Sequence, residues 1–404
     1  MGLPAALGPL ESRDFRRYFA ASVTNAVGGW ASMVALSFGV LGRGSATDLG
    51  LVFLAREIPL VVFVLAGGVW ADRWSRRSIL VWTNVLACGA QGLTAAALLA
   101  GWPLGVIAAA QIVGGGAQAF SRPASTGFIQ ELVPTEQLHQ ANGLNSLSWS
   151  SVSFIGAGIG AVLVEGIGPG WALAVDAATY GGAALLLAGI RRGARTRPNA
   201  ETSPLADLRD GWRAFRSYSW VVAMVISFGI YQLTLFPALE VLGPLVAKNH
   251  LGGAGAWAVI LIAGAVGSLV AGVASLHATP RRPLVVTIAG SSLIAVQLAL
   301  LGVVAPVWVI AAAAFVGSVG LVLSDNVWFT TLQANIPEDQ LGRISSFDWL
   351  GSIALNPIGY ALVGPLAAAT SVRAVLIGSA AIMAGSSAAV AAVPSVRELR
   401  RRTA

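Results

Sequence analysis

Three ionisable side chains lie inside stretches of sequence that are otherwise apolar. Arg56 and Glu57 interrupt the apolar run 49–71, and Glu240 lies within the run 220–246. An ionisable group deep in a bilayer costs several kcal/mol and is rare without a role. A carboxylate at such a depth can take up a proton from one side and release it to the other. Glu57, Arg56 and Glu240 are therefore the proton-coupling candidates, with an interhelical ion pair as the alternative for Arg56 and Glu57.

The composition explains why these charges stand out. Charged residues make up 11% of the 404 residues and apolar residues 56%, whereas ordinary soluble domains carry roughly 25% charged residues. The chain is therefore predicted to be an all-α integral membrane protein. Each span needs about 20 mostly apolar residues. Twelve runs qualify, at 18–41, 49–71, 79–100, 103–125, 143–165, 170–190, 220–246, 255–277, 284–305, 307–331, 344–367 and 372–393.

The second six spans repeat the first six. A shift of 203 residues (333 − 130) places 130–138 on 333–341 and keeps Gln, Pro, Gln and Leu in register. The same shift places Ser121 on Ser324. Two six-helix pseudo-repeats in parallel register are expected.

The longest polar stretch separates these two sets of spans. The predicted domains are a first half, 1–190, a cytoplasmic linker, 191–219, and a second half, 220–404. Within the linker, 205–216 can form an amphipathic helix on the membrane surface.

Basic residues gather on one side of the predicted membrane. All 25 lysines and arginines except Arg43, Arg56, Lys248 and Arg373 fall in the amino-terminal segment, at or close to the turns after even-numbered spans (Arg122 lies at the inner end of the run 103–125), or in the carboxyl tail. This asymmetry places both termini in the cytoplasm, and it explains the net charge of +7 without nucleic acid as a partner.

Cys88 is the only cysteine, so no intrachain disulfide forms. No nucleophile–base pair, Walker loop or metal-ligand spacing is found, so neither an enzyme nor a cofactor or metal is predicted.

The turn between the second and third spans is the most highly charged hairpin. Residues 68–77 read Gly-Val-Trp-Ala-Asp-Arg-Trp-Ser-Arg-Arg. This resembles the signature of major facilitator superfamily transporters, in which a glycine, an aspartate, a basic residue and a closing basic pair follow at fixed spacing. Ser75 stands where that signature usually has glycine. The alternative reading is that the arginines merely follow the positive-inside rule.

The resemblance implies a role for this hairpin in gating. Asp72 is expected beside the start of span eleven, closing the cytoplasmic side, with Arg122 as a second partner. The 203-residue shift places Arg122 on Asp325, which is expected to pair with Arg281 or Arg282 as a latch of reversed polarity. The gating residues are thus Gly68, Asp72, Arg73, Arg76, Arg77, Arg122 and Asp325.

Several motifs resemble the drug-exporter branch that contains macrolide and enterobactin exporters. They are Phe-Arg-Arg at 15–17, Arg-Glu-Ile-Pro at 56–59 and Glu-Leu-Val-Pro at 131–134. Two departures are present: 156–161 lacks the proline of the antiporter signature, and Gln111 stands where many antiporters carry arginine. The resemblance implies a multi-pass inner-membrane antiporter, acting as a monomer, that exports amphiphilic small molecules such as antibiotics, drugs or siderophore-like metabolites in exchange for protons.

Two other functions are compatible with parts of the sequence. A nutrient importer would need more polar residues converging on its substrate, and a membrane scaffold or sensor would not need charges at depth.

Glu57 lies 15 residues before Asp72 (72 − 57), so it is roughly 22 Å above the cytoplasmic turn at 1.5 Å per residue. Asp176 in span six is assigned a packing or interfacial role. The residues that can contact substrate, or alternatively pack helices, are Asn25, Trp30, Gln118, Trp149, Tyr231 and Gln232.

The arginine bias makes the topology testable. Reporter tags at the amino terminus, near Arg195 and at the carboxyl terminus should all report the cytoplasm, because the bias points the same way at all three sites. Protease protection of the tags in intact spheroplasts measures this directly. A periplasmic signal from any one of the three tags would overturn the twelve-span assignment.

Overall fold

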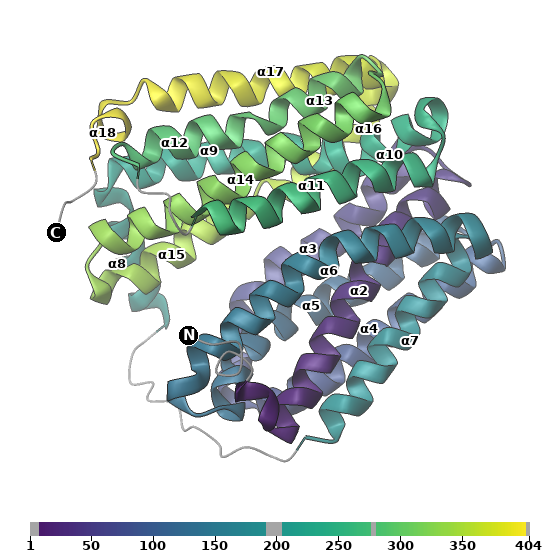
Figure 1. Cartoon of the computed structure of the whole chain (residues 1–404), viewed down its shortest axis with the longest axis horizontal. Helices are drawn as coiled ribbons and strands as arrows, with labels where there is room; N and C mark the ends of the chain where they lie inside the picture. Colours follow the sequence, from purple (N-terminus) through teal and green to yellow (C-terminus); the bar gives the residue numbers. More distant parts are fainter. Residues whose placement is uncertain (1–7, 191–203, 276–279, 401–404) are drawn as a thin grey trace. The chain divides into compact units, whose positions relative to one another are not determined.

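The computed structural model describes residues 8–190, 204–275 and 280–400, and the side chains of 64–73 and 146–151 are among those outside this description. The chain forms two compact units, Met1–Asn199 and Ala200–Ala404, each built of helices (Figure 1). The predicted boundaries at 190 and 220 stay predictions, because much of the connection between the units lies outside the described residues.

The first unit contains six long helices. They are α2 (Arg13–Leu41), α3 (Ala46–Arg73), α4 (Arg76–Leu99), α5 (Leu104–Leu132), α6 (Leu138–Ile167) and α7 (Pro169–Ala188), with short 3₁₀ turns η1 (Gly8–Glu11) and η2 (Thr135–Gln137). Helix α2 packs on α6 and α7, α3 packs on α5, and α4 packs on both α5 and α7.

The second unit repeats this packing with more interruptions. Its elements are α8 (Pro204–Ser217), α9 (Ser219–Pro237), η3 (Ala238–Leu242), α10 (Gly243–Val246), η4 (Ala247–Leu251), α11 (Ala254–Ser275), α12 (Pro283–Ser292), α13 (Ile294–Gly302), α14 (Val307–Asn335), α15 (Glu338–Ile353), α16 (Asn356–Ala369), α17 (Val372–Ala391) and α18 (Pro394–Arg397). Helix α9 packs on α15, α16 and α17, α11 packs on α14, and the pair α12 and α13 packs on α14 and α17. The same five pairings therefore occur in both units.

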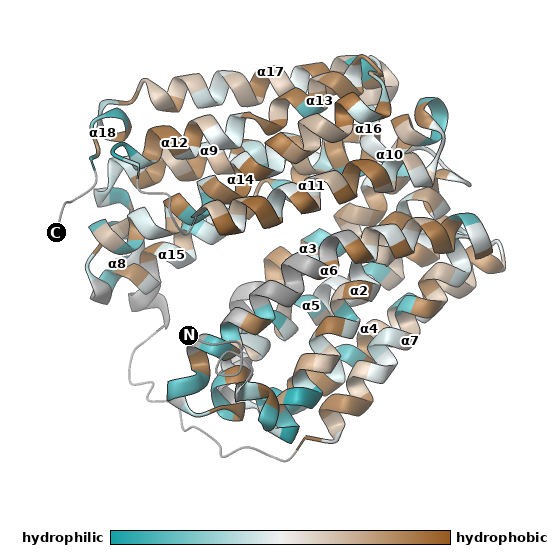
Figure 2. Ribbon diagram, viewed as in Figure 1, coloured by the Kyte–Doolittle hydropathy of each residue, from teal (hydrophilic) through white to brown (hydrophobic). Residues whose placement is uncertain are grey.

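The helices suit a membrane. Within the described residues, ten helices or joined helices are long and apolar enough to cross a bilayer, and Figure 2 shows α11 and α14 as mostly hydrophobic. The other two predicted spans fall on α3 and α6, of 28 and 30 residues, which include side chains outside the description. The all-helical membrane fold is confirmed, and the count of twelve spans stays a prediction.

Helix bounds show how closely the units repeat. Adding 203 to the bounds of α5 (104 and 132) gives those of α14 (307 and 335), and the same sum carries α7 onto α17. The prolines that precede α5 and α14, Pro103 and Pro306, share φ −55° and ψ 143°. Because equal shifts preserve lengths and turns together, the repeat predicted from the sequence extends to the backbone.

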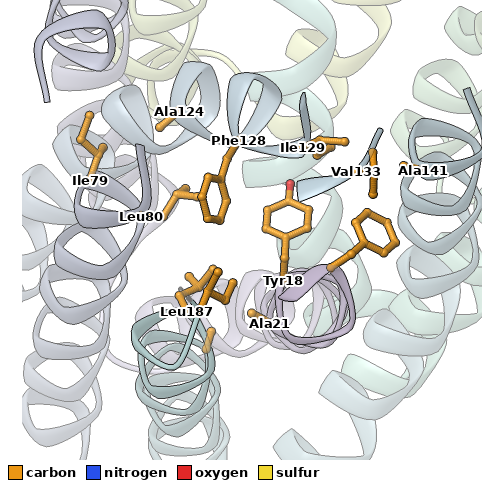
Figure 3. Close-up of a cluster of buried hydrophobic side chains, with 13 residues drawn as sticks. Tyr18, Ala21, Ile79, Leu80, Ala124, Phe128, Ile129, Val133, Ala141 and Leu187 are labelled. Carbon is orange, nitrogen blue, oxygen red and sulfur yellow. The ribbon is translucent and has the colours of Figure 1, made fainter. Parts of the chain in front are cut away.

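Each unit has an aromatic and aliphatic core near one end of its helices. In the first unit, Tyr18 packs edge-on against Phe128 with ring centroids 5.8 Å apart, and Leu80 and Leu187 lie around them (Figure 3). Corresponding positions are buried in the second unit. Under the 203-residue shift, Ile129, Val133, Ala141 and Leu187 fall on Leu332, Ile336, Ile344 and Val390, which belong to the core of that unit.

Two predicted spans are interrupted. The span 284–305 divides into α12 and α13 at Leu293, and the span 344–367 divides into α15 and α16 at Ala354 and Leu355. Pro357 is the second residue of α16, just after this break, and its ring and missing N–H prevent the preceding helix from continuing.

The predicted amphipathic helix at 205–216 is present as α8, and its Trp212 contacts Phe347 of α15 at 5.6 Å between ring centroids. Part of its apolar face is therefore covered by protein.

One turn contains a strained backbone conformation whose cost can be tested. Gly101, after α4, has φ +73°, and its equivalent Val304 has φ +52°. A left-handed backbone costs a non-glycine residue about 1–2 kcal/mol. Val304→Gly should therefore raise the free energy of unfolding by up to about 1 kcal/mol, after the entropy cost of glycine, whereas Gly101→Val should lower it. Thermal unfolding in detergent measures both, and a lower midpoint for Val304→Gly would contradict the strain.

Candidate functional site

Helix α5 carries a stripe of polar and small residues, of which Gly115 and Gln118 contact α3 and Gln111 contacts α4. Gln111, Gly115, Gln118 and Arg122 follow at four-, three- and four-residue spacing, so they share one face of the helix. Arg56 Nη2 of α3 donates to Gln118 Oε1 at 3.2 Å. A Cβ at position 115 would overlap the carbonyl oxygen of Arg56, so this glycine lets the two backbones meet. The stripe therefore brings Arg56 into direct contact with α5.

The charged groups of this region lie together. Arg56 and Glu57 are the charged neighbours that act electrostatically on Arg122. Arg56 and Glu57 are half-buried, and Arg122 is exposed. Sequence reasoning separated Arg122, as a gating residue, from the proton-coupling candidates. In the structure Arg122 lies one turn beyond Gln118 on α5 and within electrostatic reach of Arg56 and Glu57, so we group Arg56, Glu57, Gln118 and Arg122 as one polar cluster on α3 and α5.

A second polar network surrounds Asp176 of α7, whose side chain is buried and only 1% exposed. Gln91 Nε2 donates to Asp176 Oδ2 at 2.6 Å, and Thr179 Oγ1 donates to Oδ1 at 3.2 Å. Gln111 Nε2 donates in turn to Gln91 Oε1 at 3.3 Å, which links the network to α5. A Cβ at Gly28 would overlap Asp176 Oδ1. Asp176 is therefore enclosed by protein, which fits the packing role better than the interfacial one.

The charged hairpin ties three helices of the first unit together. Arg76 Nη1 forms an ion pair with Glu131 Oε1 of α5 at 3.2 Å, with both side chains about a fifth exposed (23% and 18%). Arg77 donates to the carbonyl oxygens of Leu187 and Ala188, and Arg17 donates to that of Gly189. These carbonyls end α7, where cations are favoured by the helix dipole.

Not every residue of the predicted gating motif can be placed. Gly68 and the side chains of Asp72, Arg73 and Trp149 lie outside the structural description. Glu131 was quoted only as part of a motif in the sequence. Its position just after the inner end of span four, opposite a basic pair, was the signal that could have identified it as the partner of Arg76.

In the second unit, Glu240 lies in a π-helical segment. Residues Ala238–Leu242 have π geometry, which is rare and frequently found at functional sites. Glu240 accepts a hydrogen bond from the Tyr360 hydroxyl of α16. The sequence did not predict the π segment, because its composition does not differ from that of an ordinary apolar helix.

Asp325 lies in a different environment from the one expected. Its side chain is exposed, and the charged neighbour that acts on it is another carboxylate, Asp348 of α15. No ion pair joins Asp325 to Arg281 or Arg282, all of which are described. Arg282 instead lines a cavity of about 600 Å³ with Arg397, Glu398 and Arg400. Sequence reasoning missed Asp348, although it is a carboxylate within the apolar run 344–367.

The substrate-contact candidates lie mainly at helix contacts. Asn25 Nδ2 donates to Asn84 Oδ1 of α4 at 2.7 Å. Trp30 lies against α6, where a Cβ at Gly156 would be 2.6 Å from the Cβ of Trp30. Tyr231 is 4% exposed and hydrogen-bonds Ser291 and Ser387, whereas Gln232 is half-buried. The surroundings of Asn25 and Tyr231 fit helix packing, and a role in substrate contact stays a prediction for all of these residues.

The comparisons identify the family. The sequence profile of the Major Facilitator Superfamily matches residues 18–355, so the chain belongs to this family of membrane transporters. It is 29% identical over 331 residues to the enterobactin exporter EntS of Shigella boydii, covering 80% of this chain and 78% of that protein. It is 30% identical over 285 residues to the uncharacterized MFS-type transporter y4rN of Sinorhizobium fredii, covering 67% of this chain and 65% of that protein.

Solved structures share the fold at low identity. The nucleoside transporter NupG has a TM-score of 0.76 at 11% identity, covering 96% of this chain and all (100%) of that chain. A bacterial homologue of the iron transporter ferroportin, in an inward-facing state, has a TM-score of 0.71 at 16% identity, covering 93% of this chain and 98% of that chain. These structures confirm the predicted fold, and the match to the family over residues 18–355 confirms the predicted family.

The Asp176 network gives a stability prediction. Asp176→Leu removes the acceptor of Gln91, whereas Thr179 keeps the backbone carbonyl oxygen of residue 176 as an acceptor. A buried polar group left unpaired costs about 1–3 kcal/mol. The thermal unfolding midpoint in detergent should fall clearly for Asp176→Leu and less for Asp176→Asn, which keeps one acceptor oxygen. Equal midpoints for wild type and Asp176→Leu would show that the network contributes nothing to stability.

Proposed function

We propose that this protein exports amphiphilic small molecules from the cytoplasm by proton antiport. Its place is the inner membrane, with both termini cytoplasmic, twelve spans and two six-helix halves. Two observations support the direction and substrate class. The relatives covering about four-fifths of the chain (80%) carry the name enterobactin exporter. The helices carry few charges, which suits a cavity for amphiphilic compounds better than one for sugars or inorganic anions.

The polar cluster on α3 and α5 is the single observation that carries the proton-coupling part. Arg56, Glu57 and Arg122 are held near one another on helices whose other residues are mostly apolar. Ionisable groups at such depth are costly and mark ion pathways. The direct contact between Arg56 and Gln118 fixes the arginine, so the positive charge beside Glu57 stays in place while the carboxylate gains or loses a proton.

Glu57 is the only carboxylate of this cluster, so in this proposal it is the group that takes up a proton from one side of the membrane and releases it to the other. Arg122, whose environment depends on Glu57, is the residue through which this change of protonation reaches α5.

Glu57→Gln should abolish uncoupler-sensitive export while folded protein remains in the membrane. The amide keeps the size of the side chain and loses the group that binds the proton. Accumulation of a panel of amphiphilic compounds in cells, measured with and without an uncoupler, provides the readout.

The matched control is Glu165→Gln, because Glu165 is an exposed carboxylate near the end of α6. This variant should export like the wild type. Uncoupler-sensitive export by Glu57→Gln at the wild-type rate would remove Glu57 from the mechanism. Loss of the folded protein would support the ion-pair reading instead.

A further inference from the structure

Two carboxylates approach one another on α14 and α15 of the second unit. Asp325 lies ten residues before the end of α14 (335 − 325), and Asp348 lies ten residues after the start of α15 (348 − 338). At 1.5 Å per residue, each is about 15 Å from the turn that joins these helices. The helices continue beyond the apolar runs, so the depth in the hydrocarbon core is smaller: Asp325 lies six residues before the end of the run 307–331 (331 − 325), and Asp348 lies four residues after the start of the run 344–367 (348 − 344). Both are therefore inside the core at a similar depth, roughly 6–9 Å from its predicted cytoplasmic edge.

One hydrogen bond holds the buried member of the pair. Asp348 is 5% exposed, and its Oδ2 accepts from Trp328 Nε1 at 3.1 Å. Trp328 lies three residues after Asp325 on α14, so the indole and the Asp325 carboxylate project from neighbouring positions of one helix face. This geometry directs both groups of α14 towards Asp348.

The other oxygen of Asp348 has no partner. Within the described part of the chain, nothing donates a hydrogen bond to Asp348 Oδ1, although the atom is buried. A buried acceptor left unpaired costs free energy, and an unpaired buried charge costs far more. The carboxyl group therefore needs a positive partner or a bound proton.

No described cation of the second unit serves as the positive partner of Asp348. Helices α9, α11, α12 and α13, which pack on α14 or α15, contain no charged residue or histidine. Helix α8 carries Arg209, Arg213 and Arg216, but none of them is among the groups that act on Asp325 or Asp348. The acting charge on Asp325 is Asp348 itself. The remaining charges are on α15, whose Glu338, Asp339 and Arg343 side chains lie outside the described residues.

The two halves differ at these positions. Under the 203-residue shift, Asp325 corresponds to Arg122 and Asp348 to Asn145. The first half thus carries a permanent cation and an amide where the second half carries two acids. An arginine and an amide do not exchange protons near neutral pH, whereas two adjacent carboxyl groups share one readily because both cannot easily be ionised together.

We propose that Asp325 and Asp348 form a proton-binding site in the second half, in which the Asp325 side chain is exposed and the Asp348 side chain is buried. The proton comes from water, binds one carboxylate oxygen and is released to water unchanged. A hard metal cation would require several oxygen ligands at once, and the two carboxylates are the only acids that the described residues bring here. The proposal deepens the proton antiport proposed above by adding a second site, and it assigns Asp325 proton exchange in place of the latch predicted from the sequence.

Infrared difference spectroscopy on the purified full-length protein tests this site without transport. The wild type should show the carbonyl band of a protonated carboxyl group, which disappears as the pH rises. Asp348→Asn should lose this band, and Asp325→Asn should change the pH at which it appears. The control is Glu398→Gln, which removes an exposed carboxylate of the same unit and should leave the band unchanged. Asp348→Asn keeps an oxygen for Trp328, so it should fold.

Two results would overturn the proposal. One is a band unaltered in both Asp348→Asn and Asp325→Asn. The other is a band displaced by sodium chloride at constant ionic strength, which would identify a metal-cation site. Trp328→Phe is a second variant for the case in which Asp348→Asn fails to fold. It removes the hydrogen-bond donor to Asp348 and leaves both acids in place. It should also alter the titration of the band. The band is measured without substrate, so it tests the site even if the protein proves not to be an antiporter.

Discussion

The bilayer gives a polar side chain no partner, and this constraint organises the whole molecule. Each polar group at depth must be satisfied by another helix or must serve a reaction with water or substrate. Asp176 illustrates the first solution, because Gln91 and Thr179 occupy its oxygens. Asp348 illustrates the second, since one of its buried oxygens has no partner in the described residues. The contrast separates polar groups that hold the fold from those that can exchange protons.

Close helix contacts provide the scaffold for these groups. Gly156 lets α6 approach α2, and its equivalent Gly359 lets α16 approach α9; at each position a Cβ would crowd the backbone of the partner helix. Small residues serve this purpose in membranes, where helices associate through packing and hydrogen bonds. The repeat preserves such contacts, while the ionisable residues differ between the halves. The 203-residue shift places the Arg56–Glu57 pair of the first half on two apolar residues, Val259 and Ile260, in the second.

Much of the fold was predictable because it depends on composition and period. Apolar runs predicted the long helices, and a single shift predicted the repeat that α5 and α14 display. The predicted ends were too short where helices continue beyond the apolar core, as at α5, which extends to Leu132. An apolar run marks the part of a helix that lies inside the bilayer and not the ends of the helix. It therefore could not show how far α5 extends. The break before Pro357 was signalled by the proline, but the break at Leu293 had no comparable signal.

The candidate site was predictable only in part. Glu57 and Arg56 were identifiable as charges within an apolar run, and Asp348 satisfied the same criterion although sequence reasoning did not select it. Contacts such as Arg56 with Gln118 depend on how each helix is rotated about its axis, which one sequence does not determine. Asp325 was expected to pair with Arg281 or Arg282, because the 203-residue shift places it on Arg122 and so predicted a latch of reversed polarity in the second half. In this conformation its charged neighbour is Asp348 instead.

Transport by the purified protein in liposomes, under pH gradients of opposite sign, tests the central claim most directly. An amphiphilic substrate should move towards the acidic side in both cases, opposite to the protons, and its flux should reverse when the gradient is reversed. Flux in the same direction as the protons, or flux that is indifferent to the gradient, would contradict proton-driven export.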